Sequence, residues 1–200
     1  MIQFFMKGGP LMWPLLAVSL ATVTVALERL WFILREGRSR RPADVEAFFT
    51  KLEKGQWDAA QAAGKGSTDF AARALAYGLE NRATSFSGAY LQAAARELAR
   101  FSRGLALLDT AITLAPLMGL LGTVTGLIRS FGLLGDSELQ APAALTGGIA
   151  EALIATAFGL VIAITALIPF NFLNARLEAA RREMEDAGTR AELLIQKAGK

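Results

Sequence analysis

Hydrophobic residues are concentrated in three long runs of the 200-residue chain that contain no charged side chain. These runs are residues 8–27, 110–128 and 152–175, with lengths of 20, 19 and 24 residues. A transmembrane helix needs about 20 mainly apolar residues, because each residue advances the helix by about 1.5 Å. The pattern therefore predicts three membrane helices, at roughly residues 11–33, 110–134 and 143–174.

Helical patterns also fill the more polar segment between the first two runs. The stretch that starts near Pro42 is predicted to be helical as far as Gly64 and Gly66, which favour a helix end. A second, shorter amphipathic helix is expected over residues 67–82. No part of the chain shows the strict alternation of apolar and polar residues that is typical of a half-buried strand.

Two of the membrane helices are expected to extend well beyond the apolar runs. Apolar residues recur at helical spacing before the second run, and no breaker stronger than Gly88 or Gly104 stands before Pro116. We therefore expect one long helix that continues into the membrane there, with Pro116 kinking it or loosening one of its backbone hydrogen bonds. The third helix is likewise expected to continue far into the carboxyl-terminal tail.

The distribution of positive charge predicts how the chain is oriented. Residues 35–108 contain 12 Lys and Arg against 8 Asp and Glu, and residues 175–200 contain 6 Lys and Arg. The connection at residues 135–147 has none, and Lys7 alone precedes the first helix. Because positive loops stay in the cytoplasm, the amino terminus is expected outside, in the periplasm, and the carboxyl terminus inside.

These patterns predict an all-α membrane protein whose second and third transmembrane helices extend into a helical cytoplasmic portion. We expect four parts along the chain. They are the outside amino terminus with transmembrane helix 1 (1–34), a cytoplasmic helical segment (35–108), transmembrane helices 2 and 3 (109–174) and a cytoplasmic helical tail (175–200).

Composition removes several classes of function. The chain has no cysteine and no histidine, so thiol chemistry and the usual metal ligands are absent, and neither a metal site nor a cofactor is expected. The net charge is only +3, and the arginines mostly flank apolar runs, so membrane flanking explains them better than nucleic-acid binding. The first run is longer than a typical signal-peptide core, which favours an uncleaved membrane anchor.

Small residues form stripes on the second and third membrane helices. Such spacing lets helix backbones approach closely in lipid, where association depends on packing rather than on the exclusion of water. Gly122 and Gly126 form a GxxxG pair. The residues predicted to pack helix against helix are Gly119, Gly122, Gly126, Gly148, Ala155 and Gly159.

Glu151 is the one acid placed deep in the third apolar segment, within "GGIAEALIATAFGL". Near the outer interface it would simply reach water. A helix that starts at Pro142 instead places it about 13 Å along the axis, which favours a site facing protein or water inside the membrane. An acid there costs on the order of 2.5–3.5 kcal/mol and usually marks a function. Proton binding is the chemistry expected of it.

Threonine hydroxyls near this acid are candidates to hold water or line a proton path. Thr123 lies on the second helix, and Thr156 and Thr165 lie on the third. Helical spacing turns Thr165 toward the Glu151 face and Thr156 well away from it, so Thr156 is expected to face a neighbouring helix. Membrane threonines more often bond their own helix backbone. Arg129, at the outer end of the second helix, is expected to snorkel outwards.

At this point the residues resemble a known family. "LAPLMGLLGTVTGLIRSF" and "GGIAEALIATAFGLVIAITALIPFNFLNAR" are similar to the MotA/TolQ/ExbB proton-channel family, and specifically to its ExbB/TolQ branch. "GGPLMWPLLAVSLATVTVALERLW" resembles the first helix of that branch, whereas residues 35–108 match only in being helical and cytoplasmic. The resemblance implies a ring-forming homo-oligomer, a pentamer, in the bacterial inner membrane. The ring would surround the membrane helices of two copies of an ExbD- or TolR-like protein.

The resemblance also implies a mechanism and site residues. Proton flow would move the inner pair relative to the ring, and that work would pass to a TonB- or TolA-like protein across the periplasm. The family's membrane glutamate falls on Glu151, its helix-3 threonine on Thr156 and its helix-2 threonine on Thr123. The partner supplies an essential aspartate. One departure is Thr165, which stands in "AITA" where the branch usually has "AIPA".

Other functions compete with this expectation. A passive scaffold would use Glu151 only to hydrogen-bond a neighbour, and a related stator would drive surface motility rather than uptake or envelope maintenance. An intramembrane enzyme lacks a histidine, a cysteine or a GxSG nucleophile, so no enzymatic activity is expected. A stand-alone secondary transporter would need internal repeats, and three helices without a repeat do not provide them.

Overall fold

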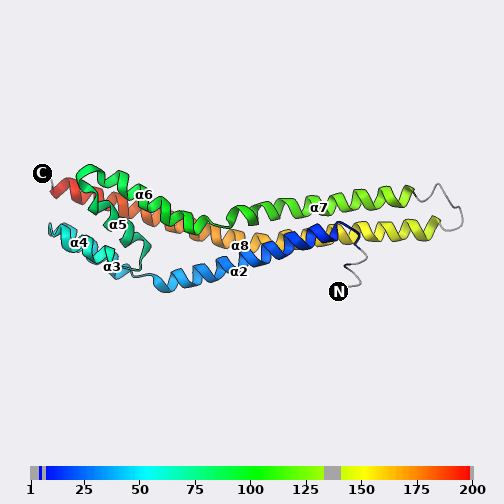
Figure 1. Cartoon of the computed structure of the whole chain (residues 1–200), viewed down its shortest axis with the longest axis horizontal. Helices are drawn as coiled ribbons and strands as arrows, with labels where there is room; N and C mark the ends of the chain where they lie inside the picture. Colours follow the sequence, from blue (N-terminus) through cyan, green and yellow to red (C-terminus); the bar gives the residue numbers. More distant parts are fainter. Residues whose placement is uncertain (1–4, 6–7, 133–140, 199–200) are drawn as a thin grey trace. The chain divides into compact units, whose positions relative to one another are not determined.

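The structure is a computed structural model that describes residue 5 and residues 8–132 and 141–198 (Figure 1). Within these ranges the chain is helical and has no strand, which confirms the all-α expectation. Lys7 and the first part of the expected outer connection, residues 135–140, lie outside the described residues. The helices are α2 (Met12–Ser39), α3 (Pro42–Glu53), α4 (Trp57–Lys65), α5 (Phe70–Glu80), α6 (Arg82–Ser102), α7 (Leu105–Gly132) and α8 (Ala141–Ala198).

Three helical stretches are long and apolar enough to cross a membrane, namely Met12–Ser39, Arg82–Gly132 and Thr146–Ala198. Charged side chains elsewhere in these stretches place the crossing parts around the uncharged runs recognised in the sequence. The prediction of three membrane helices is therefore confirmed. In the second stretch the uncharged run lies in α7, so α6 with its arginines lies outside the membrane-spanning part.

Contacts within the chain divide it into two units, which are described separately. Unit 1 comprises Met1–Arg29 and Gly104–Phe172, and unit 2 comprises Leu30–Arg103 and Leu173–Lys200. Unit 2 thus joins the segment between the first two apolar runs to the tail. The contact between these two segments agrees with the expectation of three crossings, which would place both on one side of a membrane.

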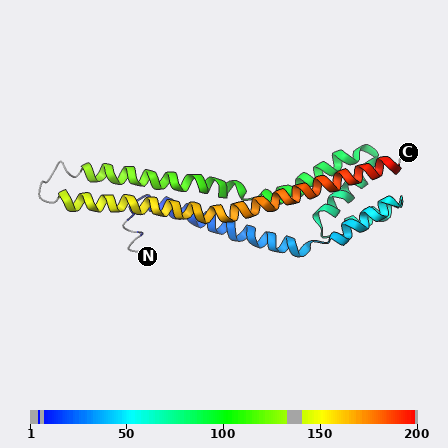
Figure 2. The same ribbon diagram turned by 180° about the vertical axis from the view of Figure 1, so that it is seen from behind.

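The core of unit 1 is small and comes from three helices. Met12 and Leu15 of α2 pack against Ala115 of α7 and Ile162 of α8. Figures 1 and 2 show α7 and the first part of α8 lying side by side in opposite directions. Many large apolar side chains on all three helices remain exposed, as expected where lipid or another subunit covers them. Partly buried side chains packed against this core are Phe5, Val18, Met118 and Ile154.

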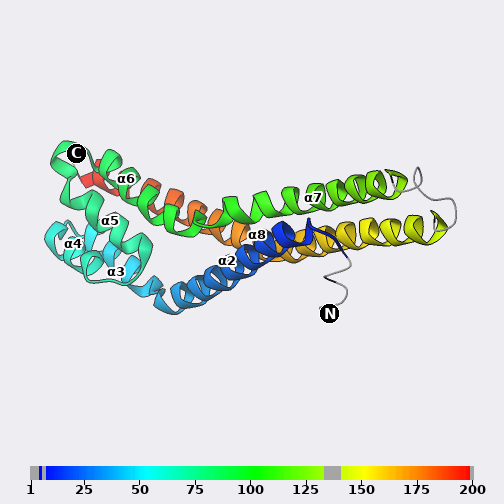
Figure 3. The ribbon, with the colours of Figure 1, turned by 45° about the vertical axis from the view of Figure 1, so that its right-hand side comes forward.

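In unit 2 the helices α3 to α6 pack in sequence order against one another (Figure 3). Tyr90 of α6 and Glu46 of α3 also form hydrogen bonds with the end of α8. Pro42 occupies the first turn of α3, where its missing N–H is not needed. Asp69 caps α5, because its carboxylate accepts a hydrogen bond from the Ala71 N–H at 2.9 Å. The fully buried large side chains here include Phe48, Phe49, Leu52, Leu75 and Leu79.

The expectation of one unbroken helix that continues into the second membrane span is wrong. α6 ends at Ser102 and α7 begins at Leu105, with Gly104 between them at a φ of +81°. Only glycine adopts this left-handed backbone readily. A Cβ on Gly104 would also lie 2.8 Å from Val25 Cγ1, so close packing on α2 adds a second reason for glycine.

Two further expectations about helix length have different outcomes. The helix expected from Pro42 to Gly66 is instead two helices, because the chain turns at Gly55 between α3 and α4. The expectation that the third membrane helix runs on is confirmed, since α8 has 58 residues. Pro116 and Pro169 lie inside α7 and α8, and neither proline ends its helix.

Candidate functional site

Glu151 lies on α8 at the edge of its contact with α7. Its neighbour Ala152 is buried, as is Ala155 one turn further on, so this face of α8 is packed against protein. The Glu151 side chain retains 24% exposure. The carboxylate is therefore half-buried, on a helix made of the small and apolar residues that membrane helices favour.

Arg129 of α7 pairs with this carboxylate. Its Nη1 donates to Glu151 Oε1 at 3.1 Å, while 55% of the Arg129 side chain remains exposed. The sequence expectation for Arg129, that it snorkels outwards, did not include this ion pair. The opposite charge on the adjacent helix offers a nearer partner than water at the membrane surface.

The turn before α2 meets Glu151 from another direction. Gly9 has a φ of +77°, and a Cβ added there would overlap Glu151 Oε1. Its carbonyl accepts the N–H of Met12 at 3.2 Å, so the turn leads directly into α2. Glycine at this position therefore serves both the turn and the close approach of the carboxylate.

The glycines predicted to pack helix on helix lie along the contact of α7 with α8. A Cβ on Gly122 would lie 2.5 Å from Ala155 Cβ, and one on Gly126 would lie 3.0 Å from Ala152 Cβ. A Cβ on Gly119 would lie 3.0 Å from Thr156 Cα. These distances are at or below the limit for real Cβ contacts. Only glycine, which has a hydrogen where other residues carry a Cβ, therefore lets the two backbones approach so closely.

The same contact extends beyond these three positions. A Cβ on Gly159 would overlap the backbone carbonyl of Ala115, and one on Gly148 would overlap Ser130 Oγ. Small residues therefore face each other along several turns of two antiparallel helices. We define this contact as the α7–α8 seam, formed by Ala115, Gly119, Gly122, Gly126, Ala152, Ala155 and Gly159.

The three candidate threonines occupy different settings. Thr156 Oγ1 donates across the seam to the Gly119 carbonyl at 2.9 Å, which agrees with the spacing that turned it toward a neighbouring helix. Thr123 and Thr165 each donate to their own helix, at the carbonyls of Leu120 (2.6 Å) and Val161 (2.7 Å). Since a hydroxyl has one proton to donate, none of the three donates to Glu151 in this arrangement.

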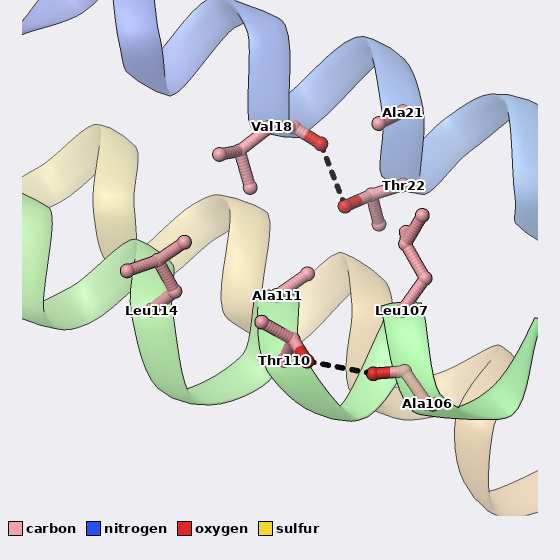
Figure 4. Close-up of a pocket in the computed structure, with 8 residues that line it drawn as sticks. All are labelled: Val18, Ala21, Thr22, Ala106, Leu107, Thr110, Ala111 and Leu114. Carbon is pink, nitrogen blue, oxygen red and sulfur yellow. Dashed lines mark hydrogen bonds between the residues drawn. The ribbon is translucent and has the colours of Figure 1, made fainter.

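A cavity of about 340 Å³ lies between α2 and α7, away from Glu151 (Figure 4). Its two hydroxyl groups already donate to carbonyls of their own helices, Thr22 to Val18 and Thr110 to Ala106. The remaining surface is apolar, so the cavity suits methyl and methylene groups rather than a polar ligand. Its lining residues are Val18, Ala21, Thr22, Ala106, Leu107, Thr110, Ala111 and Leu114.

The chemistry available at the site is the exchange of a proton. A carboxylate can accept a proton and release it, whereas an arginine guanidinium keeps its proton in proteins. Within the described ranges no group of three or more acidic, histidine or cysteine side chains is placed to hold a metal ion. Glu151 is therefore a side chain of this site that can exchange a proton, and Arg129 carries a fixed positive charge beside it.

Sequence reasoning missed Arg129 and Gly9 as neighbours of Glu151. A signal for Arg129 was present in the two stripes of small residues. Matching Gly126 with Ala152 in an antiparallel pair brings Arg129, one turn after Gly126, beside Glu151. No comparable signal pointed to Gly9, because the path of the chain before a helix does not follow from periodicity.

Known proteins are similar to this chain over a region that includes the site. The family model of the MotA/TolQ/ExbB proton channel family matches residues 65–186. The chain is 40% identical to the ExbB-like 1 protein of Synechocystis sp. over 181 residues, which cover 86% of this chain and 70% of the relative. It is 37% identical to the ExbB-like 3 protein of the same organism over 171 residues, covering 82% and 80%. Over 80 residues it is 42% identical to the biopolymer transport protein ExbB of Neisseria gonorrhoeae, covering 40% and 36%.

Proposed function

Because the chain belongs to the MotA/TolQ/ExbB proton channel family, we propose that it passes protons through Glu151 and so energises a TonB- or TolA-like protein that spans the periplasm. The chain is a multi-pass membrane protein, and its family makes it a proton-channel subunit of biopolymer transport. The proposal adds the residue that carries the proton and the protein that receives the work.

The position of Glu151 is the observation that carries this proposal. A carboxylate within an apolar, membrane-length helix costs on the order of 2.5–3.5 kcal/mol, so its presence there favours a functional role. Each proton that crosses supplies about 2.3 kcal/mol per 100 mV of membrane potential. A group that binds and releases protons within the membrane can therefore couple that energy to movement.

The threonines have supporting roles in this proposal. Thr156 ties α8 to α7 beside the site, through its bond to the Gly119 carbonyl. Thr123 and Thr165 hold their hydroxyls on their own helices and would reach water only by rotating away from these carbonyls. We propose that all three line the path that protons take to and from Glu151.

The remaining parts of the proposal concern assembly and orientation. We propose a homopentameric ring in the bacterial inner membrane, around two copies of an ExbD- or TolR-like single-helix protein whose aspartate completes the proton path. The amino terminus lies in the periplasm, and unit 2 lies in the cytoplasm, where its excess of Lys and Arg favours it. The exposed apolar faces of α2, α7 and α8 supply surface for lipid and for neighbouring subunits.

A specific observation also favours a second candidate function. The ion pair with Arg129 is the kind of contact that a passive scaffold would make with Glu151. In that case Glu151 would hold α7 and α8 together without exchanging a proton. The two functions differ in what is lost when the acid is replaced, namely proton flow in the first and assembly in the second.

Replacement of Glu151 by glutamine tests the proposal. The complex isolated with its natural membrane partners is reconstituted into lipid vesicles, and proton entry under an imposed membrane potential is followed with a pH-sensitive dye. Glu151→Gln is expected to lower proton flux at least tenfold while native mass measurement finds the same assembly. Glu185→Gln, the same change at an exposed position of α8, is expected to keep wild-type flux.

Two results would contradict the proposal. Full proton flux through Glu151→Gln would remove Glu151 from the path. Loss of the assembled complex in both Glu151→Gln and Glu151→Ala, with normal assembly in Glu185→Gln, would favour the scaffold.

A further inference from the structure

We propose that the end of α2 binds an anionic phospholipid at the membrane surface. Trp31 and Leu34 lie in the lipid there, and the guanidinium groups of Arg35 and Arg38 bind its phosphate. All four side chains belong to unit 2. The inference goes beyond the proposed function and does not depend on it, since it concerns only the outer surface of α2 and the lipid that covers it.

Large apolar side chains are exposed on α2 beyond its uncharged run. Trp31 is 64% exposed and Leu34 is 58% exposed, although both follow Glu28, the first charged residue after the run. Exposed apolar side chains that lie next to one another mark a surface that meets lipid or protein rather than water. The end of α2 therefore has an occupant outside its own chain.

The exposed side of α2 in the membrane span continues into this surface. Leu20, Leu27 and Leu34 follow one another at intervals of seven residues, which is close to two full helical turns, and all three are exposed. Because α2 is one unbroken helix from Met12 to Ser39, these side chains project from nearly the same side of it. This continuity with the apolar face of a membrane helix favours lipid as the occupant.

Positive charge at the end of this side selects the kind of lipid. Arg38 lies four residues after Leu34 and seven after Trp31, so it is on the same side of the helix. Arg35 lies beside them, with its guanidinium carbon 5.6 Å from the centre of the Trp31 ring, and both arginines are exposed. Tryptophan is typical of the headgroup level of a membrane, and arginine there is attracted to anionic lipids.

The acids on this part of α2 do not neutralise the two arginines. Glu28 pairs with the arginine that follows it, and Glu36 is buried and pairs with Arg100. In the part of the chain that the structure describes, no carboxylate forms an ion pair with Arg35 or Arg38. Their charge is complementary to a lipid phosphate, which a guanidinium binds through paired hydrogen bonds.

Quenching of tryptophan fluorescence by brominated phospholipids tests the proposal. Trp13→Phe combined with Trp57→Phe leaves Trp31 as the single tryptophan of the full chain. The protein is placed in vesicles of phosphatidylglycerol and phosphatidylcholine, with bromine on the chains of one lipid and then of the other. Each arginine near an anionic surface contributes roughly fivefold. We therefore expect phosphatidylglycerol to be preferred at Trp31 by at least about tenfold.

Variants of the two arginines show whether their charge causes the preference. Arg35→Gln combined with Arg38→Gln is expected to bring the preference close to one, whereas the corresponding pair of lysine substitutions should keep most of it. Arg82→Gln is the matched control, because it removes the same charge from an exposed position at the start of α6 and should leave the preference unchanged.

Three results would overturn the proposal. If neither brominated lipid quenches Trp31, protein rather than lipid covers the end of α2. Equal quenching by the two lipids would mean that Trp31 meets lipid without selection of a headgroup. A preference that survives both glutamine substitutions would mean that Arg35 and Arg38 do not bind the phosphate. None of these results bears on proton flux through Glu151, which is measured separately.

Discussion

α8 makes two kinds of contact along its length, one in each unit. In unit 1 it meets α7 through glycine and alanine, with backbones so close that added methyl groups would overlap. In unit 2 it is held by side-chain bonds, since Glu183 pairs with Arg40 and the Met184 carbonyl accepts from the Tyr90 hydroxyl. The same helix thus relies mainly on close backbone packing in unit 1, where Thr156 and Glu151 add polar contacts, and has more side-chain partners in unit 2.

The two kinds of contact follow from the surroundings that each unit suits, lipid for unit 1 and water for unit 2. In lipid, apolar side chains gain nothing from leaving the solvent, so helices associate through close packing. In water, burial of Phe48 and Leu75 supplies the driving force, and charged groups must then find partners wherever they are buried. Unit 1 should therefore respond to changes in side-chain size, and unit 2 to changes in polarity.

The largest expected effect comes from enlarging a glycine of the seam. In Gly159→Leu the new side chain would overlap the Ala115 carbonyl, which is backbone and cannot turn away. We expect about 3 kcal/mol or more of destabilisation and at least a tenfold loss of well-folded protein. Size-exclusion chromatography of the detergent-extracted full chain measures this loss.

Gly147→Leu is the matched control for this change. Gly147 lies on the same helix and is exposed, and a Cβ added there would meet no neighbouring side chain or other helix within 4 Å. The control is expected to yield as much folded protein as the wild type. Similar losses in the two variants would mean that leucine itself, rather than the seam, is responsible.

The next effect concerns the buried acid of unit 2. Asp69 is fully buried and caps α5. It forms an ion pair with Arg40, whose Nε lies 3.1 Å from Asp69 Oδ2, and it accepts a hydrogen bond from the Arg41 N–H at 3.0 Å. Asp69→Ala is expected to cost about 3 kcal/mol, because it removes the cap and leaves buried donors without an acceptor. Hydrogen exchange of α5 in the full chain should accelerate roughly hundredfold.

Asp69→Asn separates the cost of losing the helix cap from the cost of losing the negative charge. Asparagine can still cap α5, but it does not carry the charge that faces Arg40. A smaller acceleration than in Asp69→Ala is expected. Equal acceleration in the two variants would mean that the charge contributes nearly all of the effect and the cap very little.

Some helices of the two units could be predicted from the sequence and some helix ends could not. The three membrane helices follow from the uncharged runs alone, because lipid leaves few other structures possible. The break at Gly104 could not be predicted, since one glycine inside a strong helical pattern is a weak signal. Glycine is needed there for its left-handed backbone and for the approach of Val25, which comes from a distant part of the chain.

In the candidate site, too, the sequence did not reveal a contact that depends on a distant part of the chain. Glu151 stands out in the sequence because an acid conflicts with its apolar surroundings. The pairing of Arg129 with Glu151 was missed, because a helix considered by itself offers an arginine only the membrane surface. Its partner comes from the next helix, and the register of two helices depends on fitting both stripes of small residues together.

A moderate effect is expected from the buried hydroxyl of unit 2. Tyr90→Phe removes the hydrogen bond to the Met184 carbonyl and should cost about 1 kcal/mol at neutral pH. Burial, with the charge of Glu183, raises the pKa of the Tyr90 hydroxyl above its ordinary value of about 10. Above that pH the unfolded chain loses the proton while the folded chain keeps it, so stability falls as the pH rises.

Thermal unfolding followed by circular dichroism at pH 8 and pH 11 measures both the loss of the hydrogen bond and the alkaline loss of stability. The wild type is expected to lose more stability than Tyr90→Phe between the two values, because the variant lacks the hydroxyl. Tyr77→Phe, which changes a more exposed tyrosine in α5, is expected to keep the alkaline loss of the wild type. An identical alkaline loss in all three proteins would contradict the assignment to Tyr90.

The smallest effect is expected at an exposed contact of unit 2. Arg190 of α8 donates to Glu46 at 2.9 Å and lies over the ring of Phe49, with its guanidinium carbon 4.1 Å from the ring centre. Arg190→Met keeps an apolar stem of similar length and removes the charge, so it should cost less than about 1 kcal/mol. Hydrogen exchange of α3 in the full chain should accelerate severalfold at most.

Salt then distinguishes this contact from the seam. Because the pair is exposed, raising the ionic strength to 1 M shortens the screening length to about 3 Å and should erase much of the difference between Arg190→Met and the wild type. The loss caused by Gly159→Leu should not change, since overlap of atoms does not depend on charge. If salt left the Arg190→Met difference intact, packing of the arginine stem on Phe49, rather than its charge, would hold α3 against α8.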